Sequence, residues 1–179
     1  MRGAPARREA AVLVPVYRDT RTGALRMILV RRGPHGRHGG QVAFPGGVRD
    51  EGDESLLATA LRETEEELGL HRAHIEVLAE LPATRTRFTG FHVAPFLGRL
   101  HDVPAEWRLQ PSEIASVLDA GVGDLARAEI RSEAMPGMPL WARPLRTPVL
   151  RIGEDVIWGA TLRILTPLLP RLAAGEWPV

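Results

Sequence analysis

Three closely spaced glutamates, Glu63, Glu66 and Glu67, have the residue type and the spacing to hold a divalent metal ion. On a helix, Glu63 and Glu67 lie one turn apart on the same flank, Glu66 lies beside both, and Glu65 falls on the other side. Like charges at this spacing destabilise a helix by roughly a few tenths of a kcal/mol per pair, and a hard cation such as Mg²⁺ or Mn²⁺ would remove that cost. The pattern therefore predicts a metal site, although a solvated acidic face would give the same glutamate run.

A helix over residues 54–68 would position these glutamates. Its apolar stripe recurs at helical spacing and would face the core. The stripe consists of Leu57, Leu61, Thr64 and Leu68. Asp53 is predicted as the N-cap of this helix, and Gly69 stands where a left-handed C-terminal cap belongs.

The remaining pattern predicts a mixed sheet with helices on its faces, which is the α/β class. Alternating or continuous apolar runs bounded by turn residues predict strands at residues 10–17, 25–31, 41–44, 75–81 and 91–97. A second helix is expected over residues 112–120, and strand and turn over residues 141–152. A closing amphipathic helix is expected to start near Ile157 and to be kinked or ended by Pro167.

Composition excludes several kinds of function. The chain of 179 residues, with 44% hydrophobic and 25% charged residues, fits one domain over residues 1–179. A net charge of +1 favours neither nucleic acid nor a membrane surface as partner. Cysteine is absent, which excludes disulfides and thiolate chemistry. No apolar run is long enough to span a bilayer, so a cytoplasmic protein is expected; a homodimer is compatible with the sequence.

The segment around the glutamates resembles the Nudix box, Gly-x5-Glu-x7-Arg-Glu-U-x-Glu-Glu-x-Gly-U, where U is aliphatic. Residues 62–70 match its second half, with Thr64 at one aliphatic position. The first half departs from it: Gly47 to Asp53 keeps the first spacing, with Asp for Glu, and leaves one residue too many before Arg62. If the motif is instead counted back from Arg62, Glu54 occupies the position of its first glutamate, and Val48 occupies the position of its first glycine.

The resemblance implies the Nudix α/β/α sandwich with a mixed sheet. It also implies that Glu63 and Glu67 ligate the metal and that Glu66 is a further ligand or the base that activates water. Arg62 would orient these glutamates, and the backbone of Gly46 and Gly47 would approach the metal closely. A base outside the box is open, with Glu113 and Glu133 as candidates.

Residues 31–47 resemble the motif that precedes the box in coenzyme A pyrophosphatases, chiefly through Gly40-x3-Phe44-Pro45-Gly46-Gly47, although the spacing from Arg37 to Gly40 is one residue short. Further similar places are Leu81-Pro82, Thr89-Gly90-Phe91 and Ile157-Trp158-Gly159-Ala160-Thr161. The resemblance implies a CoA-like nucleotide substrate, cleaved to 3′,5′-ADP and (acyl-)4′-phosphopantetheine.

Arg32 and Arg37, together with Gly46 and Gly47, are the expected substrate-binding residues, because guanidinium groups recognise phosphate. All 23 basic residues are arginine, so an arginine near a loop is weak evidence by itself. The alternatives are another Nudix specificity (ADP-ribose, dinucleoside polyphosphates or nucleoside triphosphates) and a catalytically silent nucleotide-binding module.

Overall fold

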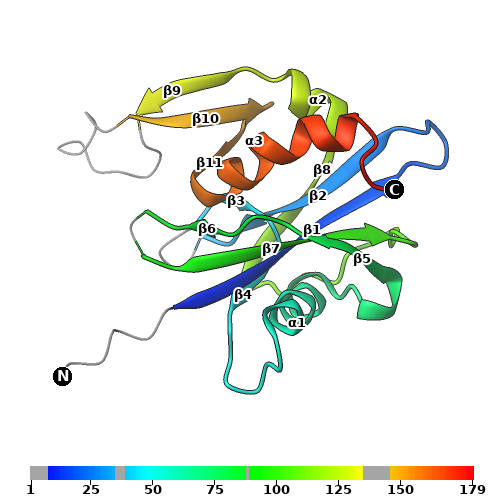
Figure 1. Ribbon diagram of the computed structural model, residues 1–179, viewed down its shortest axis with the longest axis vertical. Helices are drawn as coiled ribbons and strands as arrows, with labels where there is room; N and C mark the ends of the chain where they lie inside the picture. Colours follow the sequence, from blue (N-terminus) through cyan, green and yellow to red (C-terminus); the bar gives the residue numbers. More distant parts are fainter. Residues whose placement is uncertain (1–7, 35–38, 88, 135–145) are drawn as a thin grey trace.

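A central mixed sheet organises the protein (Figure 1), whose computed structural model describes residues 8–34, 39–87, 89–134 and 146–179. The sheet runs in the order β3-β2-β1-β7-β5, with β4 pairing to β1, β6 to β7 and β8 to β2. Its strands are β1 (Glu9–Arg18), β2 (Leu25–Arg32), β3 (Val42–Ala43), β4 (Gly46–Val48), β5 (Ile75–Glu80), β6 (Thr84–Arg85), β7 (His92–Leu100) and β8 (Ile114–Gly121). The pair β1 and β7 is parallel and the other pairs are antiparallel, so the predicted mixed sheet is confirmed.

Helices cover both faces of this sheet, as Figure 1 shows for α1 (Leu56–Leu68) on one side and α3 (Gly159–Ala173) on the other. Because side chains alternate along a strand, β1 supplies both cores. Ala11 and Leu13 pack with α1, whereas Val14 and Val16 belong to the larger cluster with α3. This arrangement is the predicted α/β/α sandwich.

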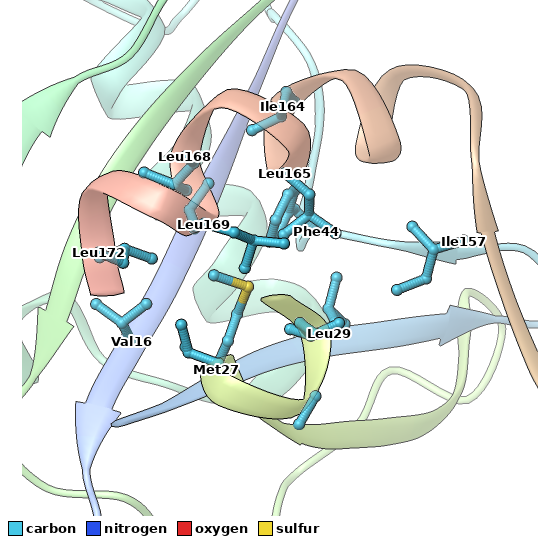
Figure 2. Close-up of a cluster of buried hydrophobic side chains, with 14 of the residues drawn as sticks. Val16, Met27, Leu29, Phe44, Ile157, Ile164, Leu165, Leu168, Leu169 and Leu172 are labelled. Atoms are coloured by element: carbon cyan, nitrogen blue, oxygen red, sulfur yellow. The ribbon is translucent and has the colours of Figure 1, made fainter. Parts of the chain in front are cut away.

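The larger core fixes the loop that leads to the glutamates. Leucines of α3 face Met27 and Leu29 of β2 (Figure 2), and Phe44, 2% exposed, is buried in the same cluster. Burying such a side chain contributes about 1.5–3 kcal/mol. Phe44 thereby anchors Pro45 and the strand β4 that follows it.

A second, three-stranded sheet lies after the short helix α2 (Val122–Arg127), in the order β11-β10-β9. Its strands are β9 (Ile130–Ala134), β10 (Arg146–Ile152) and β11 (Asp155–Trp158), and a short 3₁₀ helix spans Arg72–His74. No helix in the described part of the chain is long and apolar enough to cross a membrane.

One sequence-based prediction of an element was wrong: residues 112–120 form no helix, because Ile114–Gly121 is strand β8, paired along its length with β2. The closing helix, expected to start near Ile157, starts two residues later at Gly159, since Ile157 lies in β11. Of the two effects expected of Pro167, the end of the helix does not occur there. Pro167 and Pro170 lie on the exposed side of α3 while its leucines are buried, so packing offsets the roughly 3 kcal/mol that an internal proline costs. Residues 141–145 of the predicted strand and turn lie outside the described residues.

Candidate active site and metal centre

Helix α1 holds the glutamates in a fixed orientation through its caps and its buried face. Ser55 is the N-cap and accepts a hydrogen bond from the backbone N–H of Ala58, whereas Asp53 was predicted there. Gly69 adopts the predicted left-handed conformation (φ 66°) and donates its N–H to the carbonyl of Glu65. Thr64 and Leu68 are buried against the sheet, so the glutamate flank turns toward the Gly46–Gly47 turn.

Glu67 is the most buried acidic side chain of the site, at 1% exposure. The backbone N–H of Gly46 donates to its Oε2 at 3.0 Å, but its buried Oε1 has no hydrogen-bond partner among the described residues. Arg32 Nη2 approaches Oε1 only to 4.0 Å. Burial raises the pKa of the Glu67 carboxyl to about 7, against the opposing effect of the Gly46 N–H and Arg32. An unpartnered buried carboxylate oxygen is costly unless something else compensates it.

Glu63 lies one turn before Glu67 and directly beneath Gly47. A Cβ atom on Gly47 would lie 2.4 Å from the carboxyl carbon of Glu63, so only glycine leaves room for this carboxylate. Arg62 Nη1 donates to Glu63 Oε1 at 3.0 Å. Burial raises the pKa of Glu63 despite that arginine, and the charges of Glu66 and Glu113 add to the increase.

Glu113, which precedes β8, brings a third carboxylate to the pair. Single oxygens of Glu63, Glu67 and Glu113 all lie within 4.8 Å of one another. The register of β2 and β8 shifts between Arg31 and Arg32, and the N–H of Gly33 donates to the carbonyl of Glu113 at 2.6 Å. Glu133, the other candidate from the sequence, pairs instead with Arg151 of β10.

These carboxylates fit a hard divalent cation. The donors are all oxygens, the ligand type that Mg²⁺ and Mn²⁺ prefer. The acidic groups are crowded, and Oε1 of Glu67 is a buried acceptor that receives no hydrogen bond from the described residues and is therefore available to a cation. The Gly47 position leaves space where a side chain would displace Glu63.

Arg62 forms hydrogen bonds both to glutamates of the site and to the loop before α1. Its Nε and Nη2 donate to the two carboxylate oxygens of Asp53, both at 2.9 Å, and its Nη1 donates to Glu63 and Glu66, both at 3.0 Å. Asp53 also accepts from Thr59 Oγ1 at 2.8 Å. The Arg62 guanidinium holds the pKa of Asp53 well below its usual range. Asp53, and not the exposed Glu54, is therefore the carboxylate that pairs with Arg62. The one residue by which this chain exceeds the spacing of the Nudix box accordingly lies between Asp53 and Arg62.

The other predicted site residues lie at the edge of this group. Glu66 is 57% exposed and pairs with Arg62, outside the group of Glu63, Glu67 and Glu113. Glu65 lies on the other side of α1, near His71 and Arg72. Arg32 borders Glu67, and Arg37 lies outside the described residues.

Gly47→Ala is expected to weaken Mn²⁺ binding and turnover by roughly 10- to 100-fold, because the new methyl group would displace the Glu63 carboxylate. Gly52→Ala is the matched control: it lies in the loop that follows β4, and its added Cβ would meet no described atom within 4 Å. Mn²⁺ titration by electron paramagnetic resonance would measure the affinity of both variants. Equal affinity in the two would show that the Gly47 contact does not matter.

Comparison with known proteins places this site in a family. The model for the NUDIX domain matches residues 7–128, about two thirds of the chain. The uncharacterised Nudix hydrolase NudL of Citrobacter koseri is 40% identical over 126 residues, covering 68% of this chain and 61% of that protein. NudL of Salmonella paratyphi B is 42% identical over 114 residues, covering 63% and 56%. The chain thus spans about three fifths of the length of these curated relatives.

Solved structures share the fold beyond the matched domain. A Nudix hydrolase from M. smegmatis, RenU, superposes with a TM-score of 0.65 at 17% identity, covering 97% of this chain and 89% of that one. The NUDIX domain of Shewanella oneidensis NrtR, solved with ADP ribose, gives a TM-score of 0.59 at 19% identity, covering 94% and 90%. The box residues, the fold and the family match agree, and the chain belongs to the Nudix family.

Proposed function

We propose that this protein is a metal-dependent diphosphatase that cleaves coenzyme A or acyl-CoA into 3′,5′-ADP and (acyl-)4′-phosphopantetheine. The observation that carries the hydrolytic part is the cluster of Glu63, Glu67 and Glu113, with its unpartnered buried oxygen, beside the Gly46–Gly47 turn. The choice of coenzyme A rests on the resemblance of residues 31–47 to the motif of coenzyme A pyrophosphatases.

Glu63, Glu67 and Glu113 would hold Mg²⁺ or Mn²⁺ between them. When bound, such an ion lowers the pKa of water and neutralises charge on the diphosphate. Gly46 fixes Glu67 through its N–H, and Arg62 fixes Glu63 through Nη1, so both carboxylates are oriented before substrate arrives. Such preorganisation is what makes charged groups effective in catalysis.

Glu66 is proposed as the group that takes the proton of the attacking water, the alternative being a further metal ligand. Its carboxylate is exposed to solvent and is held by Arg62 on the same flank as Glu63. The water oxygen adds to one phosphorus, the bond from that phosphorus to the bridging oxygen breaks, and the second phosphate leaves. Arg32, 33% exposed and 4.0 Å from Glu67, is placed to stabilise a phosphate oxygen, and we propose the same role for Arg37.

The test is to incubate the purified protein with coenzyme A and, separately, with ADP-ribose in Mg²⁺ or Mn²⁺, and to identify products by mass spectrometry. We expect 3′,5′-ADP and 4′-phosphopantetheine, lost when the metal is chelated. Cleavage of ADP-ribose alone would support the proposed diphosphatase activity and would reject coenzyme A as the substrate. Nucleotide binding without metal-dependent turnover of any diphosphate would instead identify a silent binding module.

A further inference from the structure

A cavity of about 400 Å³ lies beside the loop that joins β4 to α1. Its wall includes Val48 of β4, Asp50 and Glu51 of the loop, and Phe91, which precedes β7. The volume lies within the roughly 300–1,000 Å³ of small-ligand sites. None of the proposed metal ligands lines it, so any ligand of the cavity would be bound by other residues.

The cavity combines an aromatic ring with an exposed apolar side chain. Val48 is 50% exposed, one of the large hydrophobic side chains left open in the described part of the protein. The Arg8 guanidinium lies 5.8 Å from the centroid of the Phe91 ring, so a ring and a guanidinium plane stand together on the wall. Both are surfaces on which nucleobases stack.

The polar part of the wall near the loop consists of hydrogen-bond acceptors. Asp50 and Glu51 offer carboxylates, which are acceptors only when ionised. The Arg49 guanidinium is engaged by Glu9 at 3.0 Å and donates to the Asp53 carbonyl at 3.2 Å. An exocyclic amino group of a neutral heterocycle suits these two carboxylates, whereas a phosphate placed against them would meet like charge.

Phe91 is held in place before any ligand arrives. Its N–H donates to Thr86 Oγ1 at 2.8 Å, and the N–H of Thr86 donates to the Phe91 carbonyl at 2.9 Å. Gly90, with φ 70°, provides the turn between them. Two hydrogen bonds therefore fix the backbone that carries the ring.

Residues of the cavity wall contact Arg62, which also donates to Glu63 at 3.0 Å. Val48 directly follows Gly47, and its carbonyl accepts from Arg62 Nη2 at 3.4 Å. Asp50 lies 3.6 Å from the same guanidinium. Gly47 and Asp50 are three steps apart along the chain, so their Cα atoms are at most about 11 Å apart, a span that a nucleoside diphosphate can bridge.

We propose that this cavity binds the amino-bearing purine base of the substrate, adenine in coenzyme A, with Phe91 as its stacking surface. The proposal rests on the proposed function, because it places the nucleotide half of the substrate on the β4–α1 loop. The other half, which carries phosphopantetheine, then extends away from Phe91.

The test compares inhibition by the two products of coenzyme A cleavage, of which only 3′,5′-ADP carries the base. Phe91→Leu keeps apolar volume but removes the π face, and we expect roughly 5- to 50-fold weaker inhibition by 3′,5′-ADP. Inhibition by 4′-phosphopantetheine, which lacks the base, is expected to change by less than about twofold. Val48→Ala should act in the same direction, and Val77→Ala, at a 37% exposed position on β5, is its matched control.

The proposed base site would be rejected if Phe91→Leu weakened inhibition by both products equally. It would also be rejected if inhibition by neither product changed. If the wild-type protein hydrolyses no diphosphate, the proposed function fails, and calorimetry with ADP then tests the cavity by itself. ADP binding that is lost in Phe91→Leu would support the base site, and unchanged or absent binding would reject it. A substrate analogue with hypoxanthine in place of adenine should bind more weakly to the wild type, because its 6-oxo group cannot donate a hydrogen bond to Asp50 or Glu51.

Discussion

Glu67→Gln is expected to lower kcat roughly 10²- to 10⁴-fold while the protein stays folded. The amide has the shape of the carboxylate and can still accept from the Gly46 N–H, but it removes the charge and the free oxygen that suit a cation. Steady-state kinetics and circular dichroism would measure the two effects. Glu65→Gln, on the other side of α1, is the matched control and should retain activity. Full activity in Glu67→Gln would reject the proposed site.

The same variant tests how protons compete with metal at Glu67. Because burial raises its pKa to about 7, the carboxyl of the metal-free protein is protonated at lower pH, and a cation must displace that proton. Apparent Mn²⁺ affinity should therefore rise with pH up to about 7 and then level. The folded pKa lies above the ordinary 4.5, so Glu67 makes the metal-free protein less stable as pH rises between these values. In Glu67→Gln, both the pH dependence of Mn²⁺ affinity and the pH dependence of stability should diminish. If either pH dependence is unchanged, other titrating groups cause it.

Arg62→Ala is expected to reduce the free energy of unfolding by about 2 kcal/mol, which is less than the ~3–5 kcal/mol of a fully buried pair because water reaches Arg62. The change leaves Asp53, whose side chain is 6% exposed, without its two guanidinium donors. For a chain of this size the melting temperature should fall by roughly 4–8 °C. Thermal and urea unfolding would measure it. Unchanged stability would show that Arg62 does not compensate the charge of Asp53.

A double variant separates the structural role of Arg62 from its role in the site. Asp53→Ala combined with Arg62→Ala removes the unpaired charge and should recover part of the stability. It should not recover turnover, because Glu63 and Glu66 still lack their shared donor. The low pKa of Asp53 adds a pH check: its contribution is present above the ordinary value of 3.8 and is lost as pH falls through the folded value. The stability difference between wild type and Arg62→Ala should therefore shrink in acid.

Local spacing determined much of the site. The helical positions of Glu63 and Glu67 depend on the α-helical period, which holds wherever a helix forms, so the flank that carries the carboxylates followed from the sequence. Of the predicted apolar stripe, Thr64 and Leu68 are buried, whereas Leu57 and Leu61 are half-buried. Gly69 is the C-terminal cap for an equally local reason, since glycine adopts the left-handed conformation without strain. The first two strands and their hairpin also matched their predicted ranges within a residue or two.

Only the tertiary structure decided what depends on contacts between distant segments. Residues 112–120 have a composition that allows a helix, but pairing with β2 makes residues 114–120 a strand. The register shift at Arg31 and Arg32 accompanies the position of Glu113 beside Glu63 and Glu67. By its sequence position Asp53 could equally have capped α1. It pairs instead with Arg62, nine residues later, because the loop folds back against the helix. The cavity at Phe91 brings together residues of β1 and β4 and the residue that precedes β7. Periodicity constrains neighbours along one element, whereas strand register and loop closure depend on the packing free energy of the whole fold.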